Sequence, residues 1–365
     1  MDAESRNAVA RRYVSAFQSL GSRALIANLD TRIELHGWGE YQLPITINDG
    51  ARLETFVCSP RATYLDYVLE ELDRFPDPTM ATLLRPLVRG VGALLGPAQL
   101  DRVVHINNWM LSTNLPVPLD PTLAGAQTAV LAAAFPRHML AIRSLTWRYS
   151  GVLMKALEAA GWILLPSRQV FLLDDVGRES FSRRDTRRDE QLCRQSTLGY
   201  EALDAVSPAD AARMAELYAA LYLRKYTGLN PAFTAQFIIE SHAAGLLRHL
   251  VWRDAQGVIQ AFGSLCAMGS HAAMPLLGYD QTRPQEEGLY RLAFHAGTRF
   301  AAKQSLHFNM SSGVGAFKRN RGAQGEIEYT AYFLGHLPMG RRLSFALLDK
   351  AANGVGLGVL RKYQL

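Results

Sequence analysis

Hydroxyl groups, glycines and cations are concentrated in one short stretch of the sequence, Ser305–Phe333. Small residues form its first part and cations its second: Ser311, Ser312, Gly313, Gly315, Lys318, Arg319 and Arg321. Hydroxyls, backbone N–H groups and cations in one turn can bind an anion or stabilise negative charge on a carbonyl oxygen. A structural corner with solvated cations has the same composition, so the residue types alone leave both interpretations open.

The residues on either side predict the elements that position this turn. Residues 306–310 alternate apolar and polar side chains, which is the period of a half-buried strand, and residues 327–333 alternate in the same way. A short helix fits residues 316–321, and Gly322 is placed to end it. We therefore expect strand, turn, helix and strand, with the turn at the carboxyl edge of a strand, where open sheets containing parallel strands bind ligands.

The composition is that of an ordinary globular protein. The chain has 365 residues, of which 48% are hydrophobic and 20% charged, so two domains with a core each are the natural expectation. A net charge of +6 mildly favours anionic partners such as phosphates, acidic carrier proteins or RNA. Spread over the whole chain, this charge does not indicate a nucleic-acid-binding protein.

The spacing of cysteine and histidine predicts neither a disulfide framework nor a metal site. The three cysteines lie far apart in the sequence: Cys58, Cys193 and Cys266. The histidines are scattered without ligand spacing, and the motifs of zinc proteases, serine hydrolases, P-loop proteins and dinucleotide-binding proteins are absent. Cysteines without such spacing fit a reducing cytosol, so we expect a cytoplasmic protein without a bound metal.

Two stretches bear on membrane association. Residues 1–17 predict an amphipathic helix that lacks the uninterrupted apolar core of a signal peptide. The most apolar helical run, residues 129–135, is far too short to span a bilayer. We therefore expect no membrane partner. The oligomeric state is not predicted by any pattern in the chain.

The first half of the chain predicts a hairpin followed by strands and helices. Asp49-Gly50 is the strongest short hairpin signal and would join strands at residues 43–48 and 53–58. The other elements expected before residue 175 include strands at 103–111 and 139–145, a helix at 149–160 and one or two strands within 162–173.

A charged segment separates the two halves. Residues 174–195 have no apolar period over most of their length, which favours a solvated connecting helix. Four cations on helical spacing could instead form a docking patch for phosphate or an acidic carrier: Arg183, Arg184, Arg187 and Arg188. We therefore predict an N-terminal domain at residues 1–175, a connector at 176–192 and a C-terminal domain at 193–365.

The second half has an element order that resembles a known fold. From Cys193 to Phe333 we expect β, α, α, β, β, β, α, β, α, β, which is the order of the GNAT acyltransferase fold. Phe317-Lys318 followed by Gly322, and then Glu328-Tyr329, resembles the branch related to Fem-type aminoacyl transferases. Those proteins carry two GNAT-like domains, so the resemblance implies a mixed α/β chain with two tandem GNAT-like domains, each a splayed central sheet flanked by helices.

The first half repeats the pattern of the second. Ser144 and Ser150 lie after one predicted strand and Gly161 after the next helix, as Ser311 and Gly322 do in the second half. We interpret the halves as a diverged duplication in which only the second kept the basic turn. The N-terminal domain would then be degenerate and the C-terminal domain catalytic, with the pocket between the halves.

The resemblance also implies roles for individual residues. Lys318 would stabilise charge near the reacting carbonyl, Tyr279 would donate a proton to a leaving thiol, and Glu328 would accept a proton or pair with Arg321. Residues expected to bind substrate or the thioester donor surround them: Asn309, Ser311, Ser312, Gly313, Gly315, Arg321 and Tyr329. Glu328 and Tyr329 point to opposite faces of their strand, so only one can share a site with Lys318.

One feature of the coenzyme A-dependent members is missing. The junction Asp280–Gly288 has no Gly-x-Gly pair for a pyrophosphate, and it carries two glutamates that would repel an anion. We therefore expect no tightly bound cofactor and a thioester co-substrate, phosphopantetheine-linked on an acyl carrier protein or on coenzyme A, with a small-molecule amine as acceptor. Two alternatives stay open: aminoacyl-tRNA as donor, giving amide ligation, and a non-catalytic binding protein on the same scaffold.

Overall fold

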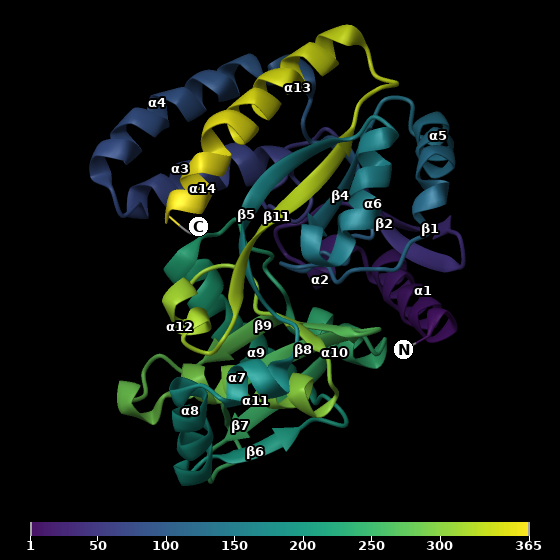
Figure 1. Cartoon of the computed structure of the whole chain (residues 1–365). Coiled ribbons are helices and arrows are strands. Elements are labelled where there is room, and N and C mark those ends of the chain that lie inside the picture. Colours follow the sequence, from purple (N-terminus) through teal and green to yellow (C-terminus); the bar gives the residue numbers. More distant parts are fainter. Residues whose placement is uncertain (1, 364–365) are drawn as a thin grey trace. The chain divides into compact units, whose positions relative to one another are not determined.

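The computed structural model describes residues 2–363, which fold into two compact units (Figure 1). Unit 1 contains Met1–Ala27, Val170–Gly228 and Ala232–Glu326, and unit 2 contains Asn28–Gln169, Leu229–Pro231 and Ile327–Leu365. The units group segments by contact rather than by sequence order. The boundaries predicted for two tandem domains, at residues 175 and 193, therefore stay a prediction.

Unit 1 contains a mixed sheet. Its four consecutive strands are antiparallel, and the fifth, β10, runs parallel to β9 through the pair Phe308–Ala272. The carboxyl end of β5 pairs with the other side of β10, with Leu173 opposite Phe308. The strands are β5 (Ile163–Leu173, from residue 170 on), β6 (Gly199–Ala202), β7 (Arg248–Arg253), β8 (Ile259–Met268), β9 (His271–Tyr279) and β10 (His307–Asn309).

Helix α11 covers this sheet because one of its faces is apolar. Leu292, Ala293 and Ala296 are buried in the same core as Phe171 and Phe308. The longer helical elements of unit 1 are α1 (Ala3–Leu20), α7 (Val176–Phe181), α8 (Arg184–Gln195), α9 (Pro208–Tyr218), the π-helix η5 (Ala219–Tyr226), α10 (Ala235–Ala243), α11 (Leu289–Lys303) and α12 (Gly315–Arg319).

The element order predicted for the second half is confirmed: β6, α9, α10, β7, β8, β9, α11, β10, α12 and β11 follow one another. The predicted starting point is wrong, since Cys193 lies on α8 and the first strand begins at Gly199. Helix α8 continues to Gln195 because its acidic side chains have partners on the elements beside it. Asp189 pairs with Arg321, and Glu190 pairs with His295.

Unit 2 contains a second mixed sheet. Strand β3 is antiparallel to β2 and parallel to β4, while β11 is antiparallel to β4, with Ala331 opposite Ile142. In sheet order β11 lies between β4 and β5. The strands are β1 (Arg32–Trp38), β2 (Tyr41–Asp49), β3 (Arg102–Ile106), β4 (Met139–Leu145), β5 up to residue 169 and β11 (Gln324–Phe333, from residue 327 on).

The hairpin predicted at Asp49-Gly50 is wrong. Strand β2 pairs with β1 on one side, through the turn at Gly39-Glu40, and with β3 on the other. Both edges of β2 are therefore occupied, and residues 53–58 form no strand. The strand predicted at 103–111 is also shorter, because Asn107 adopts φ 54° and turns the chain into a buried loop.

The helices of unit 2 pack on both faces of its sheet, with α13 and the end of α4 in one buried cluster and α5 and α6 in another. These elements are η1 (Ala62–Asp66), α3 (Tyr67–Glu71), η2 (Leu72–Arg74), α4 (Pro78–Leu94), α5 (Ala124–Ala134), α6 (Trp147–Ala159), α13 (Met339–Ala351), η7 (Ala352–Gly356) and α14 (Leu357–Tyr363). The helical run Met339–Tyr363 is 25 residues long and apolar enough to cross a membrane by length and composition alone. A single helix of this kind is weak evidence for a span, because core helices pass the same test.

Matched backbone geometry supports the predicted duplication. Ser144, next to the last residue of β4, and Ser311, two residues after β10, both adopt positive φ, 64° and 60°, which is uncommon for residues other than glycine. Gly161 after α6 and Gly322 after α12 also correspond, with φ 86° and 94°. The same two left-handed turns therefore flank a strand-following helix in each unit.

We expect Gly322→Ala to lower the free energy of unfolding by at least ~2 kcal/mol. A Cβ at this position would meet the backbone oxygen of Glu179, and φ 94° is strained for alanine. The control is Gly125→Ala on α5, where an added Cβ meets nothing within 4 Å. The control should be neutral or slightly stabilising in urea titrations. Equal stability of the two variants would contradict the assigned geometry.

Candidate active site

The turn after β10 is held by an unusual set of backbone conformations. The Asn309 Oδ1 accepts a hydrogen bond from the Ser311 N–H at 2.8 Å, and Ser311, Gly313 and Val314 follow with φ 60°, 78° and 43°. Valine rarely adopts positive φ because its branched Cβ crowds the backbone. The Phe171 N–H on β5 donates to the Ser311 carbonyl at 3.2 Å, which fixes the turn to the sheet.

Lys318 is the central side chain of this turn. It is 2% exposed, and its ammonium donates to the carbonyl oxygens of Ser311 at 3.1 Å and Ser312 at 2.7 Å. The ammonium also lies 5.6 Å from the centroid of the Phe171 ring. Since the C=O and N–H of a trans peptide point in opposite directions, the N–H groups of Ser312 and Gly313 face away from Lys318.

The two glycines predicted to contact a donor differ in their surroundings. A Cβ on Gly315 would lie 2.7 Å from the Phe171 ring, so this glycine is required by packing. A Cβ on Gly313 would meet nothing within 4 Å, and its φ of 78° favours glycine for conformational reasons. Only Gly313 therefore offers open backbone to a ligand.

Arg321 points away from the turn. Its guanidinium donates to both carboxylate oxygens of Asp189, at 2.6 and 3.0 Å, and lies 3.4 Å above the Phe317 ring. Arg291 donates to the same carboxylate at 2.6 Å. The alternative in which Arg321 pairs with Glu328 is therefore wrong, and α8 supplies the counter-charge instead.

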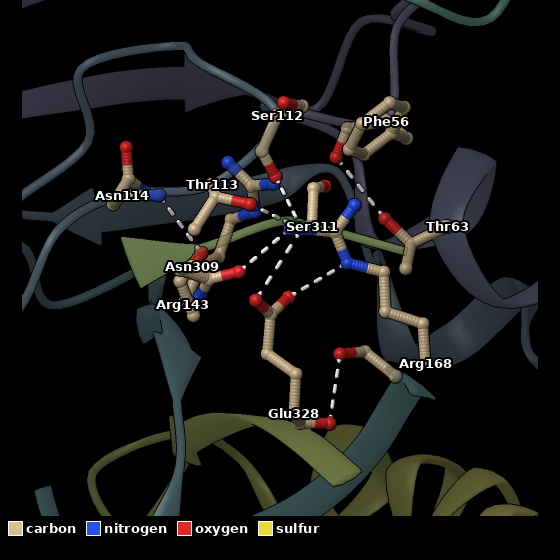
Figure 2. A network of polar contacts seen from close by, with 12 residues as sticks. Phe56, Thr63, Ser112, Thr113, Asn114, Arg143, Arg168, Asn309, Ser311 and Glu328 are labelled. Carbon is tan, nitrogen blue, oxygen red and sulfur yellow. Dashed lines mark hydrogen bonds and ion pairs between the residues drawn. The ribbon is translucent and has the colours of Figure 1, made fainter. Parts of the chain in front are cut away.

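Glu328 and Tyr329 belong to unit 2. Arg168 binds both carboxylate oxygens of Glu328, at 3.0 and 3.3 Å, and donates to the Ser112 carbonyl at 2.6 Å and to Thr113 Oγ1 at 3.0 Å (Figure 2). Glu328 is 3% exposed. A carboxylate in a bidentate pair is a poor proton acceptor, because protonation breaks the pair. Tyr329 packs in the apolar core of unit 2.

Arg143 is a buried cation that the sequence reading missed. It lies on β4, 8% exposed, and its guanidinium donates to the carbonyl of Val57 and to Asn108 Oδ1, both at 3.2 Å. Burial lowers the pKa of Arg143, and within residues 2–363 no carboxylate lies within ion-pair distance of it. A single arginine inside the apolar run 139–145 was the available signal.

A cavity of about 400 Å³ opens at the carboxyl end of β9, within unit 1. Tyr279, the predicted proton donor, is part of its wall. The centroid of its ring lies 6.1 Å from that of Tyr290, and the Tyr290 centroid lies 5.1 Å from that of Phe317. Two ring contacts therefore connect this cavity to the helix that carries Lys318. The lining residues are Arg213, Glu216, Leu217, Ala220, Arg224, Lys225, Tyr279, Asp280, Gln281 and Thr282.

Charges around the cavity are distributed unevenly. Arg213 neutralises Glu216 at 2.8 Å and Asp280 at 2.6 Å. Burial alone would raise the pKa of Asp280, but hydrogen bonds from Thr282 and Arg213 outweigh it and hold the pKa below its usual range. Arg224 and Lys225 are exposed at the end of η5, and neither makes an ion pair with any residue in the described range.

The junction between β9 and α11 is closed by its own side chains. Asp280 accepts from the N–H and hydroxyl of Thr282, and Arg283 binds Glu287 at 2.6 and 3.0 Å. Gly288 is the only glycine of the junction. Its φ is 60°, and a Cβ added there would meet the side chain of Leu192. This junction therefore provides cation–carboxylate pairs in place of a Gly-rich phosphate turn.

The comparisons with known proteins bear on the fold. No family model matches the chain, and no curated protein matches it. Among solved structures, FemX is similar over 96% of this chain and 98% of its own, with a TM-score of 0.55 and 9% identity. The L-PGS of Bacillus licheniformis matches over 62% of this chain and 77% of its own (14% identity, TM-score 0.46). A tandem GNAT protein from the clavulanic acid pathway matches over 63% and 75% (14%, 0.36).

The chain therefore has a GNAT-like fold, as predicted. More particularly, it has the tandem form of that fold, related to the Fem-type transferases. The FemX likeness covers nearly the whole of both chains, and at this low identity it establishes the fold alone.

We expect Arg168→Met to lower the free energy of unfolding by about 3 kcal/mol, because it leaves the buried Glu328 carboxylate unpaired. The double variant Arg168→Met/Glu328→Met should recover more than half of that loss in the same urea titration. Glu328→Gln tests the other role. If it abolishes turnover while the unfolding free energy is unchanged, the residue acts as a proton acceptor and the structural assignment fails.

Proposed function

We propose that this protein is an acyltransferase that moves an acyl group from a thioester donor to an amine or a similar nucleophile. The donor would be an acyl carrier protein or acyl-coenzyme A. The observation that carries the proposal is the position of Tyr279, which lines a cavity at the carboxyl end of a central strand in a GNAT-like fold. A cavity of about 400 Å³ is within the size range of small-molecule sites.

The reaction balances with the groups at this site. The neutral amine attacks the thioester carbonyl, a C–N bond forms, and the C–S bond breaks. The Tyr279 hydroxyl gives its proton to the departing thiolate, and the proton released by the amine nitrogen restores the phenol, directly or through water. A phenol hydroxyl within hydrogen-bond reach of the sulfur can act as the general acid at the moment of C–S cleavage.

Lys318 supports the same step through the turn that it holds. The Lys318 ammonium donates to two carbonyl oxygens, so it does not act as a free cation. It polarises those two peptide groups and thereby strengthens their N–H donors, which face the opposite way. A carbonyl oxygen that develops negative charge at this turn would be stabilised by the Gly313 N–H, with Asn309 and Ser311 holding the turn.

The charges at the cavity favour a donor with one phosphate group. The β9–α11 junction lacks a Gly-rich turn, and two of its acids, Asp280 and Glu287, are paired with arginines. Arg224 and Lys225 provide positive charge from the other side of the cavity, on η5. A phosphopantetheine arm carries a single phosphodiester. Two cations therefore match its negative charge more closely than the larger charge of a pyrophosphate.

A second candidate function is aminoacyl transfer from aminoacyl-tRNA. The observation that favours it is the likeness of fold to FemX along the whole chain. One exposed ring beside the cavity agrees with it: Tyr226 is exposed, and its centroid lies 6.0 Å from that of Tyr222, which stacks on the buried Tyr218 at 4.9 Å. Exposed aromatic rings next to cations are typical of single-stranded RNA sites.

One experiment separates these functions. The protein is incubated with a panel of amines and, in turn, an acyl carrier protein thioester, the acyl-coenzyme A and an aminoacyl-tRNA, and acyl loss is followed by mass spectrometry. Loss from a thioester alone supports the proposal, and loss from the tRNA alone replaces it with the second candidate. If no donor is consumed, a binding protein on the same scaffold remains.

We expect Tyr279→Phe to lower kcat by about a hundredfold while KM stays within about twofold, because the ring is kept and only the proton is lost. Thiol release with a chromogenic disulfide reagent measures both constants. Tyr200→Phe is the control, since Tyr200 is 49% exposed on β6 and does not line the cavity. An unchanged kcat would remove Tyr279 from the chemistry.

We expect Arg224→Gln/Lys225→Gln to raise KM for carrier-bound and coenzyme A thioesters about tenfold, with kcat unchanged, because it removes the cations that face the donor phosphate. The matched donor is an acyl-N-acetylcysteamine thioester, which has no phosphate and should show the same KM with both proteins. If KM rises equally for this donor, the two side chains act on something other than the phosphate.

A further inference from the structure

Two helical segments of unit 2 expose a continuous set of large apolar side chains. On α4 these are Leu83, Leu87 and Leu94, and on α13 they are Met339, Leu343 and Leu347. Leu83, Leu94, Met339 and Leu343 are each more than 60% exposed. We call these six side chains the α4–α13 ridge. Scattered single leucines need no explanation, but this concentration on two neighbouring helices does.

The ridge is rigid because the two segments are joined at both ends. Ser344 Oγ donates to the Leu94 carbonyl at 2.8 Å, and the Tyr363 hydroxyl donates to Asp77 Oδ2 at 2.8 Å. The segments therefore run antiparallel and side by side (Figure 1). The inner face of α13 is fully packed, with Phe345 0% and Leu348 3% exposed.

The spacing gives the ridge a low and even profile. Leu83 and Leu87, like Met339, Leu343 and Leu347, recur every fourth residue and form rows along their helices. Glycines fill the positions between and beyond them. A Cβ on Gly90, Gly340 or Gly354 would meet nothing within 4 Å. Rows of exposed apolar side chains along a helix suit insertion into a lipid interface.

The charge beside the ridge is positive. Arg89, Arg342 and Lys350 are exposed on these helices, and α4 carries no acidic residue. The one acid of the segment 339–363, Asp349, is half-buried and accepts a hydrogen bond from Asn353 at 2.8 Å. A second copy of this chain would place like charges against each other, and the ridge has no aromatic side chain of the kind that anchors protein interfaces.

We propose that the α4–α13 ridge is a peripheral membrane-binding surface for anionic phospholipid. The apolar rows enter the boundary between headgroups and acyl chains, and the flanking cations contact the lipid phosphates. This inference is independent of the proposed function and differs from our expectation, drawn from the sequence, that the protein has no membrane partner.

We expect the full-length protein to co-sediment with vesicles of phosphatidylcholine and phosphatidylglycerol, and about tenfold less with phosphatidylcholine alone. Leu83→Ser/Leu343→Ser should lower the partition coefficient about tenfold, because two exposed leucines no longer enter the lipid. Val130→Ser/Val152→Ser is the matched control, since both valines are exposed on other helices of unit 2, and it should bind like the wild type.

The cations are tested in the same assay. Arg89→Gln/Arg342→Gln should abolish the preference for anionic vesicles, while Lys155→Gln/Lys303→Gln, which changes two exposed lysines elsewhere, should keep it. The proposal is overturned if the wild-type protein binds neither kind of vesicle. It is also overturned if Leu83→Ser/Leu343→Ser binds anionic vesicles as well as the wild type does. Sedimentation velocity provides the other arm: a dimer that disappears in Leu83→Ser/Leu343→Ser would show that a second copy, not lipid, covers the ridge.

Discussion

The candidate site depends on one buried cation, the Lys318 ammonium. Removing an ammonium from water is costly unless hydrogen bonds replace its hydration, and two carbonyl oxygens of the Ser311–Ser312 turn do so here. The arrangement works in both directions. The lysine needs the turn to satisfy its charge, and the turn needs the lysine because Ser311 and Val314 are held at positive φ, which costs free energy. Helix α12, only Gly315–Arg319, brings the side chain back to the residues that precede it.

Other buried charges in the protein are satisfied differently, and the differences separate structural from chemical roles. Arg321 and Arg168 each donate hydrogen bonds through two nitrogen atoms to both oxygens of one carboxylate. Each charge is thereby paired with an opposite charge. Such pairs fix elements in place and leave no proton to exchange. Lys318 instead donates to two peptide carbonyl oxygens, those of Ser311 and Ser312. Its charge can therefore act on the peptide groups around it.

The sequence allowed the element order of the second half to be predicted because each element there has a clean local signal. Ser207 caps α9 with Pro208 at its first position, and strand β9 is a mostly apolar run. The failures have a common cause, which is competition for strand edges and partners far away in the sequence. Asp49-Gly50 is a good turn, but β1 and β3 already occupy both edges of β2. Cys193 remains helical because Asp189 and Glu190 find partners on α12 and α11. No local pattern carries that information.

The site residues show the same division. Residue types predicted the turn of Ser311 to Lys318, since the chemistry is local, but the partner of Arg321 depends on a helix more than a hundred residues earlier in the chain. The cavity beside Tyr279 is likewise built from α9, η5 and the end of β9, which only the folded sheet brings together.

The electrostatics of the cavity depend on which arginine is already paired with an acid. The Arg213 guanidinium donates to Glu216, Asp280 and the Ile259 carbonyl. The positive field on the cavity therefore comes from Arg224 and Lys225 on the π-helix. A π-helical turn at that point displaces two consecutive cations relative to an α-helix, and π-helical segments occur frequently at functional sites. The irregularity in η5 therefore affects where Arg224 and Lys225 lie on the cavity wall.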